Sequence, residues 1–298
     1  MLFKLLLTSS LVFAAAPERI KKEARELLSQ HQFKQALDKS NELIESNYSE
    51  ALYLRSHIHM AMGQLNKAYE DAVLANAQVP GSVGELLLHK VELERENFKM
   101  AGYHLENAKR LYDYTDTQLL NRINLAQLKY LFTIKNHKSL VDIWKGTQYQ
   151  EEQVWADLWA ARAEWALGNK EEARQVLDKV LKLNRDAQFL IYSAQFTNSE
   201  YVRTEFLAEA EKTVRKELED GLIGHRVELA EILLLQNTAD SVKEALGILN
   251  SELYIRNTAQ VKGLLSQAWK QNSQFSFEKG QYTQALFQKV NAIRFSLF

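Results

Sequence analysis

The sequence predicts an all-helical protein built from repeated pairs of helices, and three observations support this prediction. Turn-forming residues are scarce, with 2 prolines and 11 glycines among 298 residues, below the usual shares of about 5% and about 7%. Alanine, leucine, glutamate, lysine and glutamine, which favour helices, are abundant. A short pattern of turn chemistry followed by alanine also recurs at a period of about 34 residues, which is typical of stacked helical repeats.

The first residues have the composition of an export signal. Lys4 and the amino terminus are followed by an apolar run over residues 5–13 and then by small residues. The run is shorter than the roughly 20 apolar residues of a membrane-spanning helix. Val12 and Ala14 suit the two positions that a signal peptidase reads, so we expect cleavage between Ala14 and Ala15.

A signal peptide over 1–14 predicts a mature protein in the periplasm or outside the cell, with the helical array over 17–298. The chain has no cysteine, which excludes disulfides and lipid attachment through an N-terminal cysteine. Because the apolar run is too short to span a membrane and cleavage would remove it, we expect no stable membrane span in the mature protein. The alternative is that the apolar start belongs to the first helix of a cytoplasmic protein.

Each repeat is marked by a turn residue, an apolar or aromatic residue two positions later, and an alanine five positions later. The five copies are His31, Phe33 and Ala36; Gly63, Leu65 and Ala68; Glu96, Phe98 and Ala101; Gly168, Lys170 and Ala173; and Gly280, Tyr282 and Ala285. Lys170 departs from the apolar position. The longer gaps between alanines have room for further units, one of them around Ala245.

This pattern resembles the tetratricopeptide repeat family. The residues that carry the resemblance most fully are Gly63, Leu65, Ala68, Ala75 and Pro80 in one unit and Trp269, Gly280, Tyr282, Ala285 and Ala292 in another, with small residues at Ala24, Ser56, Ala161 and Ser273 where paired helices cross. Small residues let helices approach closely, and glycine supplies the turn. The resemblance implies an α-solenoid of antiparallel helix pairs, coiled into a right-handed superhelix of roughly seven or eight pairs.

Three parts of the chain match the pattern less well. Leu140 stands where alanine is expected, and residues 186–220 offer only Ala194, Ala208 and Ala210 as candidates. The unit around 222–250 has a longer turn over 237–240. We expect hinges at 113–117 and 198–200, where turn-forming polar residues gather.

No motif for catalysis, metal or cofactor binding is present, and we predict that the protein is not an enzyme. His57 and His59 point in different directions on a helix and cannot chelate together. Residues 221–224 lack the strand that precedes a phosphate-binding loop, and the carboxylates of 92–96 do not face one another. A net charge of −1 without a basic run argues against nucleic-acid binding.

In the family, ligands lie on the concave surface that the first helix of each pair lines. The positions that the resemblance assigns to this surface are Glu50, Tyr53, His57, Met60, Leu86, Lys90, Leu93, Trp155, Leu158, Arg162 and Trp165. Such a mixed apolar and basic lining suits segments with apolar and acidic character. The lysine and asparagine pattern that grips a terminal carboxylate in some family members is not evident.

Two apolar features leave alternatives open. Trp155 and Trp159 share a helix face and Trp165 is turned away, so these rings either fill the core or form an aromatic floor for a ligand. The chain ends in an apolar segment over 293–298, which either folds back or leaves an apolar end for docking and self-association.

Together these features predict a non-catalytic scaffold or adaptor that binds a peptide or helix of a partner protein in its concave groove. Export would place it in cell-envelope assembly, secretion or surface-polymer machinery. Two alternatives stay open. One is a glycan- or substrate-binding accessory subunit of an envelope enzyme, and the other is a cytoplasmic assembly factor.

Overall fold

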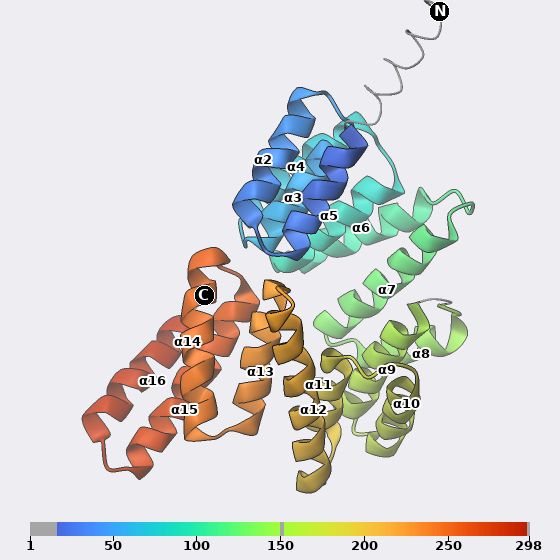
Figure 1. Cartoon of the computed structure of the whole chain (residues 1–298). Coiled ribbons are helices and arrows are strands. Elements are labelled where there is room, and N and C mark those ends of the chain that lie inside the picture. The colour runs from blue at the N-terminus through green and yellow to red at the C-terminus, as the bar shows by residue number, and fades with distance from the viewer. Residues whose placement is uncertain (1–16, 150–151, 297–298) are drawn as a thin grey trace, which may run out of the picture. The chain divides into compact units, whose positions relative to one another are not determined.

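The computed structural model describes residues 17–149 and 152–296, and every regular element in them is helical (Figure 1). The predicted all-α fold is therefore confirmed. The predicted signal peptide over 1–14 lies outside the described residues. None of the described helices is both long and apolar enough to cross a membrane. The chain divides into two compact units, unit 1 up to Asp116 and unit 2 from Thr117, and each is described by itself.

Unit 1 consists of three helix pairs. They are a helix over residues 17–29 with α2 (Phe33–Glu45), α3 (Ala51–Ala61) with α4 (Leu65–Gln78), and α5 (Ser82–Glu94) with α6 (Phe98–Arg110). One buried cluster joins the first pair to α3, and a second joins α4 to α5. The unit ends at the 113–117 segment, where the sequence predicted a hinge.

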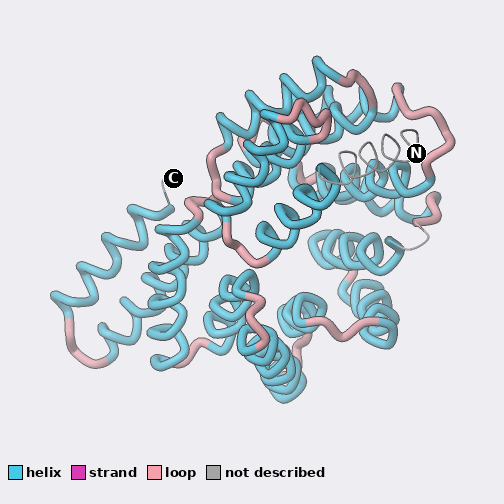
Figure 2. The backbone as a smooth tube through the Cα atoms, turned by 45° about the horizontal axis from the view of Figure 1, so that its top comes forward, coloured by secondary structure: helices cyan, strands magenta, loops and turns pink. Residues whose placement is uncertain are grey.

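Unit 2 consists of five helix pairs, and the loops that the structure describes between its helices are short (Figure 2). The pairs are α7 (Thr117–Thr133) with α8 (His137–Gly146), α9 (Gln153–Leu167) with α10 (Lys170–Leu183), α11 (Ala187–Phe196) with α12 (Glu200–Glu219), α13 (Arg226–Gln236) with α14 (Ala239–Ile255), and α15 (Ala259–Glu278) with α16 (Tyr282–Ser296). A short 3₁₀ turn, η2 (Ile223–His225), precedes α13. The described residues thus form eight helix pairs, in agreement with the predicted seven or eight.

The five positions that the repeat pattern predicted as turns share one backbone conformation. All five predicted turn positions have a positive φ: His31 (56°), Gly63 (72°), Glu96 (60°), Gly168 (91°) and Gly280 (73°). In each turn the next residue donates its backbone N–H to the carbonyl five residues earlier, as Gln64 does to His59 at 2.8 Å. This bond closes the end of the first helix and explains why the turn needs a left-handed residue.

The repeat alanines lie where paired helices approach one another. Ala36, Ala68, Ala101, Ala173 and Ala245 are 0% exposed, and Ala285 is 6% exposed. The small residue of the first helix reaches the same place, since Ser56 Oγ donates to the carbonyl of Ala68 at 2.8 Å and Ser273 Oγ to that of Ala285 at 3.0 Å. These contacts give the repeat spacing a packing reason.

The stretch that matched the pattern poorly is an ordinary helix pair, α11 with α12. Of its three candidate alanines, Ala194 and Ala210 are fully buried, whereas Ala208 is exposed. Its turn has no glycine because Ser199 caps α12, its hydroxyl accepting the Val202 N–H at 3.4 Å. A side-chain cap thus replaces the left-handed turn of the other pairs.

Candidate protein-binding surface

The predicted positions of unit 1 lie on the first helices of their pairs, with His57, Tyr53 and Met60 on α3, Lys90 on α5 and Glu50 at the start of α3. Glu50 is exposed, and its Oε2 pairs with Lys21 Nζ at 3.2 Å and Arg25 Nη2 at 3.8 Å. Tyr53 donates its hydroxyl to the Val79 carbonyl at 3.2 Å. The other four are half-buried, and Tyr53 and Met60 pack on the buried cluster between α4 and α5.

The Glu50 carboxylate is therefore already ion-paired within unit 1, and the Tyr53 hydroxyl is already hydrogen-bonded. Burial raises the pKa of the Tyr53 hydroxyl, and the neighbouring Glu50 charge adds to this effect. This tyrosine stays neutral and acts as a hydrogen-bonding side chain. Unit 1 consequently offers a half-buried surface with little unsatisfied charge.

Unit 2 contains a different arrangement, centred on Arg162 of α9. The guanidinium carbon of Arg162 lies 4.3 Å from the ring centre of Phe132, 4.4 Å from that of Trp159 and 4.5 Å from that of Tyr192. These rings come from α7, α9 and α11, all first helices of their pairs. Cations within about 6 Å of an aromatic ring centre are attracted to its face. We call Arg162 and these three rings the arginine cage.

The arginine cage holds a cation with unused hydrogen-bond donors. A guanidinium carries five N–H donors in its plane, yet among the described residues Arg162 forms no hydrogen bond or ion pair. Its side chain is half-buried, and burial lowers its pKa while the Tyr192 and Glu231 charges oppose this. The aromatic rings provide no hydrogen-bond acceptor of carboxylate type, so the N–H donors of the guanidinium can still bind one.

Glu231 of α13 lies beside the arginine cage without contacting the guanidinium. Gln195 Nε2 donates to Glu231 Oε1 at 3.5 Å. Burial, followed by the charge of Glu228, raises the pKa of Glu231, and Arg162 opposes this shift. The carboxylate therefore influences the charge of the cage from a distance but leaves its donors free.

The other predicted positions of unit 2 lie on the same helix as Arg162 and differ in how deeply they are buried. Leu158 is 2% exposed and belongs to the main core of unit 2, so it supports the surface from beneath. The Trp155 ring lies 4.8 Å from that of Phe189, and the Trp165 ring stacks on Phe196 at 4.9 Å with 19° between the planes. All three tryptophans of α9 are half-buried, between the two predicted alternatives of core and open floor.

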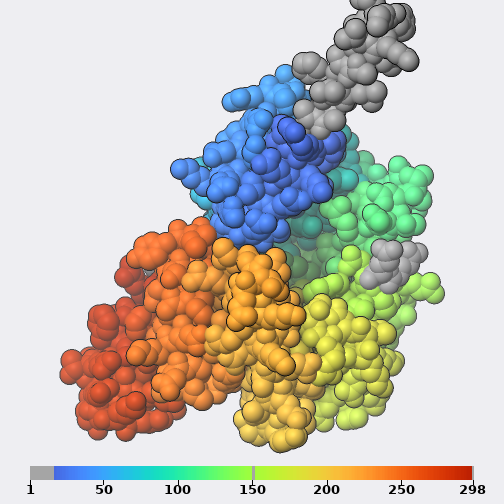
Figure 3. All heavy atoms as spheres, viewed as in Figure 1, coloured from blue at the N-terminus to red at the C-terminus, as the bar shows by residue number. Residues whose placement is uncertain are grey.

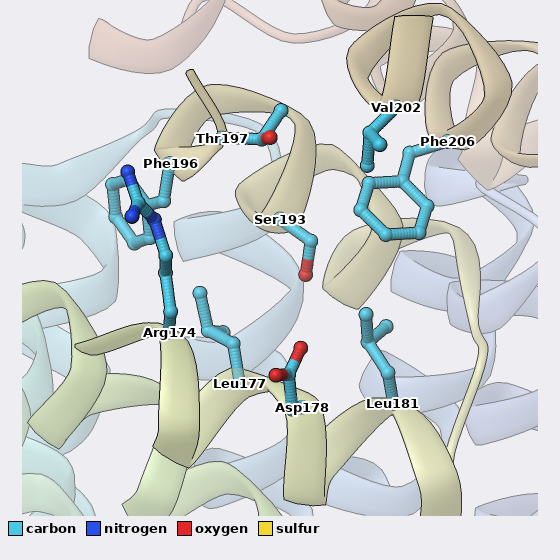
Figure 4. Close-up of a pocket in the computed structure, with 9 residues that line it drawn as sticks. All are labelled: Arg174, Leu177, Asp178, Leu181, Ser193, Phe196, Thr197, Val202 and Phe206. Carbon is cyan, nitrogen blue, oxygen red and sulfur yellow. The ribbon is translucent and has the colours of Figure 1, made fainter. Parts of the chain in front are cut away.

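Two depressions adjoin this surface. The first, of about 130 Å³, lies among α10, α11 and α12. It is lined by Arg174, Leu177, Asp178, Leu181, Ser193, Phe196, Thr197, Val202 and Phe206, and the polar ends of Ser193 and Asp178 point toward its middle (Figure 4). Its volume corresponds to a few water molecules at about 30 Å³ each. Phe196 lines this cavity and also stacks on Trp165, so the cavity adjoins the predicted surface.

The second depression, of about 280 Å³, has an acidic lining. Asp186, Glu217 and Glu228 line it together with Trp155, Ala187, Gln188 and His225. His225 Nδ1 lies 2.6 Å from Glu228 Oε2, so the histidine is engaged by a carboxylate. Within the described residues no group of three or more His, Cys, Asp or Glu side chains is arranged to hold a metal ion.

The sequence predicted Arg162 but missed the residues that define its surroundings. Phe132, Tyr192 and Glu231 lie about 30 to 70 positions away in the chain and come from other helices. Only the repeat alignment could have brought them together, since each lies on the first helix of its pair. The arrangement that results can bind an anionic group at the cation edge and apolar groups on the neighbouring rings.

Comparisons with known proteins agree with this architecture. The sequence profile of the tetratricopeptide repeat matches residues 158–186, and no curated protein sequence matches the chain. A chain of the APC/C hetero-tetramer Cut9-Hcn1 is similar in fold, with a TM-score of 0.54, 14% identity, and coverage of 92% of this chain and 52% of that one.

Two further solved structures show weaker similarity. A tetratricopeptide repeat protein from Parabacteroides merdae has a TM-score of 0.47 and 14% identity, covering 85% of this chain and 99% of that one. YrrB, described as a TPR protein with an unusual peptide-binding site, has a TM-score of 0.38 and 17% identity over 59% of this chain and 90% of that one. Taken with the eight helix pairs and their turns, the matched profile over 158–186 and the similarity to the Cut9-Hcn1 chain show that this chain has a tetratricopeptide-repeat-like fold.

Proposed function

We propose that this chain is a non-catalytic scaffold that binds a segment of a partner protein on the surface of unit 2 around the arginine cage. The observation that carries the proposal is the Arg162 guanidinium, which three rings surround and which pairs with no described carboxylate. Burying a cation without an ionic partner is unfavourable, and the aromatic rings offset only part of this cost. An acidic ligand would supply the missing ionic partner.

The chemistry of the surface defines the segment. A carboxylate accepts two parallel hydrogen bonds from the edge of a guanidinium, and this geometry is favoured over a single contact. Phe196 and Trp165 provide an apolar surface beside it. The proposed ligand is therefore a segment with an aspartate or glutamate flanked by apolar side chains.

The tryptophans give less support to a glycan-binding function. Glycan recognition by aromatic residues uses the open face of a ring. One face of Trp165 is stacked on Phe196, and the Trp155 ring is in tilted contact with Phe189. The protein-binding function needs no fully open ring, because the cation provides the recognition. We therefore place protein binding ahead of the accessory-subunit alternative.

The proposed setting is the cell envelope or the exterior. Its support is the composition of residues 1–16, which fits a signal peptide. The corresponding roles are in envelope assembly, secretion or surface-polymer machinery. Intact-mass measurement of the protein from its native host checks the setting, since a chain beginning at Ala15 supports export, whereas retention of Met1 supports the cytoplasmic alternative.

Site-specific crosslinking in the native host tests the binding surface. A photoreactive amino acid replaces Gln188, one helical turn from Tyr192, in the full chain, and a second version carries it at exposed Lys212 as a control. We expect a discrete crosslinked partner from position 188 only. Arg162→Met, which keeps the packing of the long side chain but removes the donors, should abolish that crosslink.

The same crosslink from the Arg162→Met protein would contradict the proposal. Circular dichroism shows whether this variant keeps its fold, so that loss of binding is separated from unfolding. Arg162→Lys keeps the charge but not the paired donors, and we expect it to retain only weak crosslinking.

A further inference from the structure

The last helix pair of unit 2 carries an open groove that the proposed function does not use. The C-terminal residues that form it lie at one end of unit 2 (Figure 3). A depression of about 480 Å³ runs between α15 and α16. It is lined by Lys270, Ser273, Gln274 and Phe277 of α15 and by Tyr282, Ala285, Leu286 and Lys289 of α16. Each set has the i, i+3, i+4, i+7 spacing of one helix face.

In the preceding helix pair, the equivalent groove is covered by the next helix of the chain. On α14, Val242, Ala245, Leu246 and Leu249 have the same spacing around the repeat alanine, and they are 0%, 0%, 7% and 0% exposed. Helix α15 covers them, since its Val261, Leu265 and Ala268 belong to the same buried cluster. Gln271 Nε2 of α15 also donates to the Leu234 carbonyl of α13 at 3.0 Å. The groove between α13 and α14 is thus filled by a helix.

No described helix fills the corresponding groove of α15 and α16. Tyr282 is 64% exposed, Leu286 65% and Phe277 62%. The floor is nevertheless formed, because Ala285 is buried and its carbonyl accepts the Ser273 hydroxyl at 3.0 Å. The geometry that receives a helix elsewhere in unit 2 is therefore present here without an occupant among the described residues.

The groove is apolar at one end and cationic at the other. The rings of Phe277 and Tyr282 pack edge to face beside the Gly280 turn, with 5.3 Å between the ring centres. Lys270 and Lys289 lie at the opposite end and form no ion pair with a described residue. Phe277 lies seven positions after Lys270, which corresponds to about 10 Å along a helix.

We propose that this groove is a docking site for one amphipathic helix of a partner protein that carries acidic residues. Its apolar side chains contact Phe277, Tyr282 and Leu286, and an aspartate or glutamate about two turns away pairs with Lys270 and Lys289. The occupant is a helix because a helix fills the equivalent groove. It is acidic because the lining contains two lysines and no carboxylate.

The charges of α16 argue against a second copy of this chain as the occupant. The α16 segment from Tyr282 to Ser296 contains Lys289 and Arg294 but no aspartate or glutamate. Packing two α16 helices together would place like charges side by side, which is unfavourable. A partner helix with the opposite charge meets no such repulsion.

A display library of amphipathic helices tests the proposal. Each member has a leucine and phenylalanine stripe, with residues two turns away randomised, and is selected on the full protein with counter-selection on Leu286→Asp. We expect the selected peptides to be enriched in aspartate and glutamate at the randomised positions. Failure to select any peptide, or enrichment without an acidic preference, would overturn the proposal.

Fluorescence anisotropy with the best selected peptide then locates the contact. We expect Leu286→Asp to weaken binding by at least about tenfold. Lys289→Glu should weaken it as well and should improve binding of the same peptide with lysine in place of its acids. The matched controls, Leu183→Asp and Lys212→Glu on exposed parts of α10 and α12, should leave binding unchanged.

Three results would contradict this assignment. Equal binding by the wild-type and Leu286→Asp proteins would place the peptide elsewhere, and loss of binding in Arg162→Met would place it at the arginine cage. A wild-type dimer in sedimentation experiments that Leu286→Asp dissociates would make a second copy the occupant. Because Leu286 and Lys289 are exposed, circular dichroism is expected to show the same fold in each variant.

Discussion

The α13–α14 and α15–α16 pairs of unit 2 have the same local design but opposite surroundings. Both place an alanine at the helix crossing, Ala245 in one and Ala285 in the other, and both turns contain a residue with positive φ. Leu249 is fully buried, whereas Lys289 occupies the matching position of α16 and is exposed. The side chains around the crossing are thus apolar where another helix covers the groove and partly polar where none of the described helices does.

The comparison shows that two sets of residues in a repeat have different structural roles. The alanine and the turn shape the helix pair, and the residues three and four positions away decide what covers it. Leucine and valine on α14 suit permanent burial, while tyrosine, leucine and lysine on α16 tolerate water and still present an apolar surface. The two helix pairs therefore share their local geometry, but only the groove of α13 and α14 is covered by a described helix.

The largest expected effect comes from shortening one leucine in each groove. Leu249→Ala removes a buried side chain from the filled groove and should lower the free energy of unfolding by about 2–5 kcal/mol. Leu286→Ala removes an exposed one and should change it by less than about 0.5 kcal/mol. Urea denaturation of both variants measures the difference, and similar losses would mean that the two grooves are equally covered.

Substitutions in the turns of the two pairs should change stability by different amounts. Gly280 has a φ of 73°, and no atom lies within 4 Å of an added Cβ, so Gly280→Ala should cost about 1–2 kcal/mol through backbone strain alone. Asn237 has a φ of 51°, and Asn237→Gly should change stability by only a few tenths of a kcal/mol because asparagine tolerates this conformation. Thermal denaturation compares the two, and a neutral Gly280→Ala would show that this turn can change its conformation.

The hydrogen bond beneath the open groove should contribute less. Ser273→Ala removes the donor to the Ala285 carbonyl and should cost about 0.5–1 kcal/mol, since the serine is only half-buried. Ser56→Ala breaks the same bond at a fully buried crossing and should cost more. An equal cost at both crossings, measured by urea denaturation, would mean that the open groove is shielded from water.

The smallest effect is a pH dependence in the filled pair. Burial raises the pKa of Glu231 in the folded protein, so the folded state holds this proton more tightly than the unfolded one. Stability should therefore decline as the pH rises through the raised pKa. Glu231→Gln should reduce this decline, as measured by urea denaturation between pH 4 and 8; an unchanged slope would assign it to other groups.

The repeat pattern predicted local structure better than it predicted the surface. His31 and Glu96 were assigned to turns although neither is glycine, and both have the left-handed conformation. Local sequence patterns do not predict the arginine cage, because Phe132, Arg162 and Tyr192 belong to three different helix pairs and meet only where those pairs stack. Leu158 shows the same limit, since a position on a lining helix can still point into the core.

The apolar C-terminal end contains both predicted alternatives at once. Phe295 packs against the core of unit 2, while Ile293 is 53% exposed, and residues 297–298 lie outside the described residues. Fold-back and exposure occur on different faces of the same helix. The sequence could not separate them because the direction of each side chain depends on how α16 packs on α15.

Thiol labelling tests the central distinction between the filled and the open groove most directly. The natural chain has no cysteine, so Leu249→Cys and Leu286→Cys each introduce a single reactive group. We predict that the thiol at position 286 reacts nearly as fast as a free thiol and that the selected acidic helix slows it, while the thiol at 249 is protected at least about a hundredfold with or without that helix. Equal protection of both thiols without the peptide would contradict an open groove.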